Sequence, residues 1–224
     1  AKALRSVIIH NSVASIGDYT FYNCNMLTSI TIPESVTNIG TRAFFNCTAL
    51  KDVNVNITNL AEYCKGNAIY NIPGNKHLYI NNKEITELVI PNSVTSIETR
   101  AFLGCNSLTS ITIPESVTSI GWDAFLGCSS LTSITIPESV TEIGGWAFAG
   151  CSCLTSITIP ESVTEIGCLA FDNCSSLTSI TCLATTPPAI YDLNIVENIL
   201  IYVPKEAVKA YKKDPKWSRY KKQI

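Results

Sequence analysis

The ten residues LTSITIPESV at positions 108–117 decide the fold, because the chain repeats them letter for letter. The same phrase begins again at Leu27, Leu131 and Leu154. Aligned on the first residue of this phrase, the chain divides into units of 23 residues, with one longer step of 35 residues. The units begin at Leu4, Leu27, Leu50, Ile85, Leu108, Leu131, Leu154 and Leu177. A period in the twenties with an L-x-x-L-x-L core is typical of leucine-rich solenoids.

The unit at 108–130 predicts two short strands on opposite walls of one coil. In the first strand Ser110 and Thr112 alternate with apolar residues and therefore point outward, and Pro114 ends the strand because it cannot donate to a ladder. Gly121 is expected to supply a turn of positive φ. The residues expected to fill the interior are Leu108, Ile111, Ile113, Val117, Ile120, Ala124, Phe125 and Cys128.

A single coil of this kind is not expected to be stable. Burial of about eight side chains does not offset the conformational entropy of ordering a 23-residue coil. Stacking equivalent coils adds ladder hydrogen bonds and covers both faces of each coil, so identical neighbours support one another. We therefore predict a repeat solenoid of about eight coils, a right-handed leucine-rich repeat built mostly of short β-strands and turns, with a small C-terminal strand-helix cap.

Two segments depart from the period. Residues 51–84 predict an irregular enlarged coil, with a short helix in NITNLAEYCKG and a strand pair that turns at Asn81 and Asn82. After residue 188 the chain leaves the repeat, and the sequence predicts a final strand in NILIYVP and a helix that starts at Pro204. Trp217 and Tyr220 are expected to pack against the last coil. We assign residues 1–188 to the solenoid and 189–224 to the cap.

Composition and charge narrow the class of protein. No run of eighteen apolar residues occurs, so no helix is expected to cross a membrane. From Pro204 onward there are 8 Lys and Arg against 2 Asp and Glu, whereas the rest of the chain carries 8 against 16. This acidic body argues against nucleic acid as a partner. The six cysteines that share one slot of the repeat are expected to be buried free thiols: Cys24, Cys47, Cys105, Cys128, Cys151 and Cys174.

The sequence offers no reactive cluster. Only His10 and His77 occur, and neither lies beside a nucleophile and an acid in the sequence. Cys151 and Cys153 have no matching second pair of ligands for zinc. Apart from Gly144 and Gly145 the glycines occur singly, so no phosphate cradle is expected. We therefore expect no enzyme activity, no catalytic residues, no metal and no cofactor.

Two sets of residues are candidates for binding a partner. Outward hydroxyls form a ladder on one wall, and hydroxyls donate and accept hydrogen bonds in any direction. Aromatic residues occupy variable positions after the turn glycine, and Trp and Tyr are favoured as interface anchors. The candidate partner-binding residues are Ser110, Thr112, Ser133, Thr135, Ser156 and Thr158 on the ladder, and Tyr19, Tyr22, Trp122 and Trp146 after the turn, where Phe45, Leu103 and Leu126 also lie. The ladder alternatively serves only as β-compatible polar surface, and the aromatic residues alternatively pack between coils.

The unit LTSITIPESVTSIGWDAFLGCSS closely resembles the BspA-like leucine-rich repeat family, and the segments LAEYC, HLYINNKEITELVIP and CLATTPPAIY resemble that family's irregular coil and C-terminal part. The resemblance implies a cell-surface or secreted bacterial protein, often an adhesin for host matrix proteins or other cells. It carries no catalytic motif and names no ligand.

From the residues and the resemblance together we expect a non-catalytic binding module that engages a protein or glycoprotein by surface complementarity. We expect a monomer, located outside the cell, whose export signal does not lie within these residues. Three alternatives stay open. The first is a glycan-binding solenoid that uses its tryptophans as stacking platforms. The second is a purely structural segment of a larger surface protein, and the third, more remote, is an ice- or mineral-binding surface.

Overall fold

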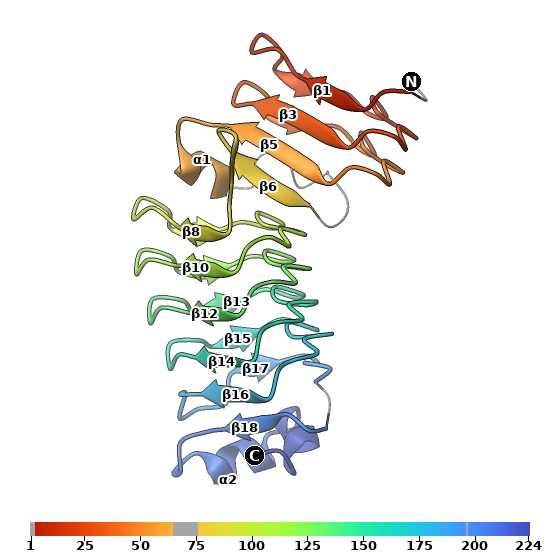
Figure 1. Ribbon diagram of the computed structural model, residues 1–224. Helices are drawn as coiled ribbons and strands as arrows, with labels where there is room; N and C mark the ends of the chain where they lie inside the picture. Colours follow the sequence, from red (N-terminus) through yellow and green to blue (C-terminus); the bar gives the residue numbers. More distant parts are fainter. Residues whose placement is uncertain (1–2, 65–75, 196) are drawn as a thin grey trace.

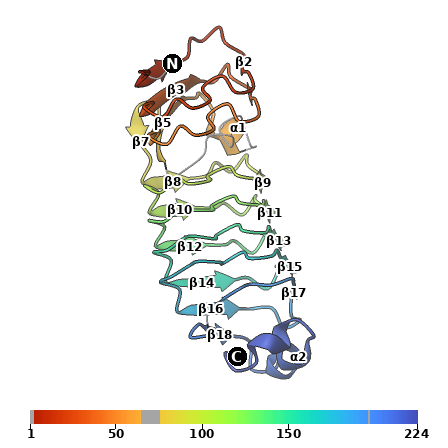
Figure 2. The same ribbon diagram turned by 90° about the vertical axis from the view of Figure 1, so that its right-hand side faces the viewer.

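The computed structural model describes residues 3–64, 76–195 and 197–224, without the side chains of residues 62 and 63. The chain winds into coils stacked along one axis, with the N-terminus at one end of the stack and a helical cap at the other (Figure 1). A view from the side shows short strands along two opposite walls (Figure 2). The predicted leucine-rich solenoid is confirmed.

The first wall contains the longer strands. Within each of three groups the strands pair in parallel with their neighbours, so that Ser110 lies opposite Glu87 on one side and Ser133 on the other. Ile111 between the outward hydroxyls is buried, as the alternation predicts. The strands are β1 (Ser6–Ile8), β3 (Ser29–Pro33), β5 (Asp52–Asn56), β6 (His77–Ile80), β8 (Glu87–Val89), β10 (Ser110–Thr112), β12 (Ser133–Thr135), β14 (Ser156–Ile159), β16 (Ser179–Cys182) and β18 (Leu200–Tyr202).

The second wall is built from two-residue strands. Ile120 is buried and lies opposite Ile97 and Ile143 of the neighbouring coils, which confirms the predicted inward position. The strands are β2 (Ser15–Ile16), β4 (Asn38–Ile39), β9 (Ser96–Ile97), β11 (Ser119–Ile120), β13 (Glu142–Ile143), β15 (Glu165–Ile166) and β17 (Ala189–Ile190). The two walls enclose a continuous apolar interior.

Two side-chain ladders run through this interior. Four phenylalanines of one slot stack in succession, with ring centroids of Phe102 and Phe125 5.4 Å apart and their planes 5° from parallel; the others are Phe148 and Phe171. The thiol of Cys128 donates a hydrogen bond to the carbonyl of Phe102 in the preceding coil at 3.1 Å. Cys47, Cys151 and Cys174 make the equivalent bond. The predicted burial of the cysteine slot is confirmed, and all ten cysteines are free thiols.

The turn glycines serve a purpose other than the predicted one. Gly121 does not have positive φ, so that prediction is wrong. A Cβ atom at Gly121 would lie 2.6 Å from the amide nitrogen of Thr99, because successive corners of the coils stack in close contact. Glu98 occupies the same slot where the preceding corner is replaced by helix α1 (Leu60–Cys64), and its amide donates to the carbonyl of Cys64 at 3.0 Å.

The irregular coil interrupts the first wall. Strand β6 pairs in parallel with β5 and in antiparallel with β7 (Lys83–Glu84), and the intervening Asn81 and Asn82 both have positive φ, so the predicted hairpin and the short helix α1 are confirmed. Within the described residues no ladder joins β6 or β7 to β8; a single parallel bridge links Lys76 to Cys105. Residues 65–75 of the predicted enlarged coil lie outside the described part.

Three aromatic residues hold the C-terminal segment against the last coil. The segment contains α2 (Val208–Lys213) and a 3₁₀ helix, η2 (Trp217–Tyr220). The indole N–H of Trp217 donates to the carbonyl of Pro188 at 2.7 Å, and the hydroxyl of Tyr211 donates to Ala184 at 2.9 Å. The predicted packing of Trp217 and Tyr220 is confirmed. The helix begins at Val208 rather than at Pro204, which instead accepts the turn hydrogen bond of Ala207.

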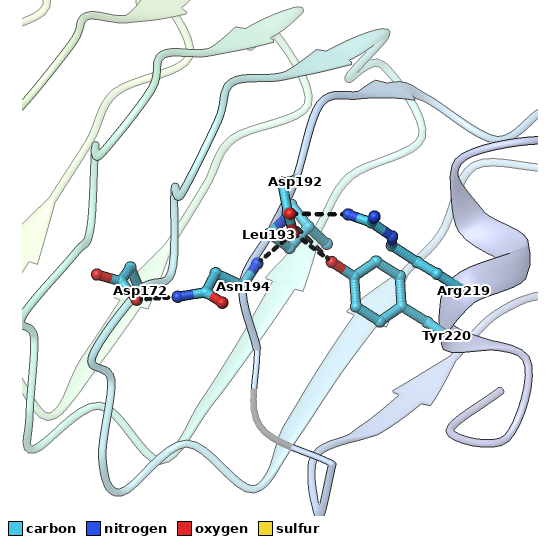
Figure 3. A network of polar contacts seen from close by, with 6 residues as sticks. All are labelled: Asp172, Asp192, Leu193, Asn194, Arg219 and Tyr220. Carbon is cyan, nitrogen blue, oxygen red and sulfur yellow. Dashed lines mark hydrogen bonds and ion pairs between the residues drawn. The ribbon is translucent and has the colours of Figure 1, made fainter.

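A polar network closes the edge of this contact (Figure 3). The hydroxyl of Tyr220 donates to Asp192 at 3.0 Å and accepts the amide of Leu193, while Arg219 pairs with the other oxygen of Asp192 at 2.8 Å. The amide of Asn194 is the main cause of the lowered pKa of the Asp192 carboxyl, and Tyr220 and Arg219 add to it. The basic C-terminal segment is thereby anchored to the acidic body. Its boundary with the solenoid at residue 188 stays a prediction.

Candidate binding surfaces

The outward residues of the first wall form two straight rows of hydroxyls. Parallel pairing places Ser110 opposite Ser133 and Ser156 opposite Ser179, and neighbouring strands of such a ladder lie about 4.8 Å apart. Of the candidate residues, Thr112, Ser133, Thr135, Ser156 and Thr158 are exposed and Ser110 is half-buried. The rows are Ser110, Ser133, Ser156, Ser179 and Thr112, Thr135, Thr158, Thr181.

These row hydroxyls differ from the other hydroxyls of the repeat. Thr132, one residue before the strand, donates to the carbonyl of Thr109 in the preceding coil at 3.1 Å, and Ser139 donates to the carbonyl of Val117 at 2.7 Å. Thr109 and Ser116 repeat the two bonds one coil earlier. Within the described part of the chain, the hydroxyls of the two rows make no side-chain hydrogen bond. They therefore keep their full hydrogen-bonding capacity for water or for a partner.

The two ends of the rows are less polar. Val89 precedes Thr112 in its row and is 68% exposed. Leu200 and Tyr202 of β18 continue the rows beyond Ser179 and Thr181, and both are exposed. Apolar side chains therefore adjoin the two hydroxyl rows at both ends.

An aromatic cluster lies on the corner of the first two coils, after the turn glycines. Tyr19 meets Tyr22 edge to face with ring centroids 5.6 Å apart, and Tyr22 stacks on Phe45 at 5.5 Å with the planes 10° from parallel. The guanidinium of Arg42 lies over the Phe45 ring, 5.5 Å from its centroid. The three rings are between 43% and 50% exposed. We call Tyr19, Tyr22, Arg42 and Phe45 the aromatic corner.

The two candidate tryptophans lie beyond the irregular coil and do not join this cluster. Trp122 is 51% exposed and Trp146, one coil further, is half-buried. Trp146 has a φ of 59°, as has nearly every residue in its slot, because the corner turns through the left-handed region there. The structure therefore brings Tyr19 and Tyr22 together but leaves the tryptophans as a separate surface on the same corner.

The corner varies from coil to coil far more than the wall. Across four consecutive coils the two wall rows contain only Ser and Thr. The first residue after the turn glycine or its equivalent is Asp18, Thr41, Thr99, Trp122, Gly145 or Cys168, and the second is Tyr19, Arg42, Arg100, Asp123, Trp146 or Leu169. A uniform row offers the same contact at every coil, so it cannot by itself fix where a partner sits. The corner can discriminate among partners because its chemistry differs at each level.

Reactive chemistry is not assembled within the described residues. His10 contacts Ser12 at 2.8 Å and His77 contacts Glu84 at 2.8 Å, and neither pair is joined by a third group of a catalytic triad. Burial raises the pKa of the Cys105 and Cys174 thiols to about 11, which keeps these thiols protonated and unreactive at neutral pH. No group of three potential metal ligands occurs in this part of the chain.

Two features of these surfaces were not found from the sequence. Arg42 was not recognised as part of the aromatic cluster, although it follows Tyr19 by one repeat unit in the same slot and precedes Phe45 by three residues. Gly145 was also missed, although it forms the only Gly-Gly pair of the chain with the turn glycine before it. Comparing the repeat units slot by slot would have exposed both.

Comparison with known proteins agrees with this architecture. The sequence profile described as "BspA type Leucine rich repeat region" matches residues 1–73 and 74–188, in 6 copies. The chain belongs to the BspA-type leucine-rich repeat family. Members of this family have solenoid folds consistent with protein-interaction modules and are typically non-enzymatic scaffolds. A search of curated proteins found no match.

A solved structure shares the fold. The pneumococcal vaccine antigen PcpA has a TM-score of 0.57 at 16% identity, with 93% of this chain and 76% of the antigen aligned, which shows the fold alone. A leucine rich cell surface protein from Faecalibacterium prausnitzii A2-165 is 36% identical, with a TM-score of 0.49. The alignment covers 83% of this chain but 49% of that protein, so the chain spans about half the length of that protein. No helix among the described residues is long and apolar enough to cross a membrane.

Proposed function

We propose that this chain is a non-catalytic binding module that engages a protein or glycoprotein partner through its aromatic corner. The observation that carries the proposal is the exposure of Tyr19, Tyr22 and Phe45 side by side, with Arg42 over the last ring. Tyr and Arg are enriched among the few residues that supply most of the binding energy of interfaces. Clustered exposed aromatic rings contribute little to folding and much to an interface.

The orientation of the rings indicates what kind of partner fits. The faces of Tyr22 and Phe45 are turned toward each other and Arg42 covers part of Phe45, so the outer surface consists mainly of ring edges and a guanidinium. Ring edges carry partial positive charge, and a guanidinium binds carboxylates in a bidentate fork. The partner surface of this proposal therefore presents an Asp or Glu carboxylate among apolar side chains.

The first wall would enlarge this contact without selecting the partner. Its free hydroxyls accommodate donors and acceptors alike, so a bound protein that extends from the corner onto the wall leaves few unpaired polar groups. This assigns Ser110, Thr112, Ser133, Thr135, Ser156 and Thr158 to the rim of the interface rather than to its anchors.

We also propose that the module is displayed outside the bacterial cell. Its support is the family membership alone. Labelling of intact producing cells with an antibody against the solenoid tests the location; a signal that appears only after lysis would contradict it.

The binding proposal is tested with purified extracellular-matrix proteins, immobilised one by one, and the soluble chain as analyte. The double variant Tyr22→Ser/Phe45→Ser is expected to lose about tenfold or more in affinity for whichever matrix protein binds, since two anchor rings are removed. The matched control is Leu126→Ser, which changes the same slot of the repeat three coils beyond Phe45. Equal loss in the control, unchanged binding in the double variant, or no binding to any matrix protein would each contradict the proposal.

A further inference from the structure

Trp122 lies flat against a glycine of the next coil. A Cβ atom placed on Gly145 would lie 2.9, 3.0 and 3.1 Å from three adjacent atoms of the six-membered indole ring, Cζ3, Cε3 and Cη2. Such nearly equal distances occur only when the atom sits above the ring and not beside its edge. The backbone at Gly145 therefore supports one face of the indole, while the side chain as a whole is 51% exposed. With one face supported in this way, the exposed half of the side chain is available to a ligand.

The glycine at position 145 is not required by the fold. Gly144 beside it does have a structural reason, because a Cβ there would lie 2.6 Å from backbone atoms of Gly121 and Trp122. Gly145 has no positive φ, and the three atoms nearest to a Cβ placed there belong to the ring of an exposed side chain. Other coils carry larger residues in this slot, namely Asp18, Thr41, Thr99 and Cys168. The absence of a side chain at Gly145 leaves the space in which the indole of Trp122 lies.

Charged groups flank this indole on the same corner. The amide of Arg100 donates to the carbonyl of Trp122 at 2.9 Å, and the Nε of Arg100 pairs with Asp123 at 3.0 Å. The Arg100 side chain is 45% exposed, and within the described residues its terminal nitrogens make no hydrogen bond or ion pair. The ion pair joins a donor group and an acceptor group of adjacent coils, and the backbone of each of the two residues adjoins that of Trp122.

We infer that Trp122 is a stacking platform for the apolar face of a sugar ring, forming a carbohydrate site distinct from the aromatic corner. The face of an indole carries partial negative charge and attracts the weakly positive C–H groups of a pyranose. Arg100 and Asp123 supply the hydrogen-bond donor and acceptor that the hydroxyls at the edge of the sugar require. A pyranose needs one flat ring and neighbouring polar groups, and this is what the corner presents.

The test uses two neutral oligosaccharides, cellotetraose and lactose, titrated into the full chain while tryptophan fluorescence and saturation-transfer NMR are recorded. Of the three tryptophans Trp217 is fully buried and Trp146 is half-buried, so a change in emission reports mainly on Trp122. We expect binding of at least one sugar in the millimolar range. Trp122→Ala should weaken it on the order of tenfold, the size of one stacking contact.

Two further variants separate a platform from a general effect on folding. Gly145→Ala keeps the indole, but the added methyl group displaces the ring from its position. Sugar affinity should therefore fall severalfold, while the thermal midpoint of unfolding stays near that of the parent chain. Trp146→Phe removes a tryptophan from the neighbouring coil and should leave sugar binding unchanged. Absence of binding for both sugars, or equal binding by the parent chain and Trp122→Ala, overturns the inference.

This result is independent of the protein-binding proposal. Tyr22→Ser/Phe45→Ser should bind the sugars as the parent chain does, since the aromatic corner lies beyond the irregular coil from Trp122. A negative result in the sugar-binding test therefore does not contradict the protein-binding proposal, and the reverse also holds.

Discussion

Phe44 and Phe45 are neighbours in the chain, yet they belong to two regions with different tasks. Phe44 is fully buried and stacks on Phe21 of the preceding coil, with ring centroids 5.0 Å apart, in a slot that holds Phe in every regular coil. Phe45 is 48% exposed in a slot that changes from coil to coil. The interior of the solenoid is constant because each coil must fit the next. The corner is free to vary because it faces solvent, and recognition is possible there.

The largest expected effect separates these two phenylalanines. Phe44→Ala should lower the free energy of unfolding by about 3–5 kcal/mol, because it removes a ladder ring and leaves a cavity. Phe45→Ala should change it by about 0.5 kcal/mol or less, as an exposed substitution does. Urea denaturation followed by tryptophan fluorescence measures both.

The adjacent position of the two residues makes each the control of the other. Similar losses in the two variants would mean that the corner rings are structural, and the contrast between interior and corner would then not hold for the first coils.

A second expected effect concerns the thiol slot and alkaline pH. Burial is the main cause that raises the pKa of Cys174 to about 11, whereas an unfolded thiol ionises near pH 8.5. Between these values the folded state holds a proton that the unfolded state has lost, so stability falls as pH rises. The thiol contributes fully below about pH 8.5 and its contribution is lost by about pH 11, with a slope of up to about 1.4 kcal/mol per pH unit.

Cys174→Ala should flatten this part of the stability profile, measured by urea denaturation at several values between pH 8 and 11. Cys153→Ala is the matched control, because Cys153 is exposed and lies outside the ladder slot. A profile as steep in Cys174→Ala as in the control would show that the ladder thiol is not the group responsible.

Most of the fold could be predicted from the sequence because the constant slots have only one physical use. Alternation of Ile with Ser or Thr specifies a strand with one buried face, and the shared slot of Cys128 and its equivalents specifies an interior ladder. The hairpin at Asn81 and Asn82 was recognisable from its turn residues. The role of Gly121 was mistaken because a requirement for glycine can come from positive φ or from close approach, and a single sequence does not distinguish them.

The candidate sites were predictable as residue types but not as surfaces. Tyr19 and Tyr22 were chosen for their chemistry, but their stacking with Phe45 and Arg42 depends on the rise between two coils. The same holds for Trp122, whose exposed face depends on a glycine 23 residues later in the chain. Contacts between equivalent slots of adjacent coils are regular in this fold, so aligning the units is the step that converts residue types into neighbours.

The smallest expected effect separates the two kinds of hydroxyl on and beside the first wall. Thr109, Thr132 and Thr178 each donate to the carbonyl of the preceding coil, whereas the wall residues Thr112, Thr135 and Thr158 have no side-chain partner in the described part of the chain. Replacing the first three by Val should cost roughly 1.5 kcal/mol in total, because each exposed hydrogen bond contributes about 0.5 kcal/mol. Replacing the second three should cost about 0.5 kcal/mol or less, since Val retains the β-branched shape. Urea denaturation of the two triple variants decides the matter: a larger loss from the wall set would mean that its hydroxyls hold the coils together and are not free for a partner.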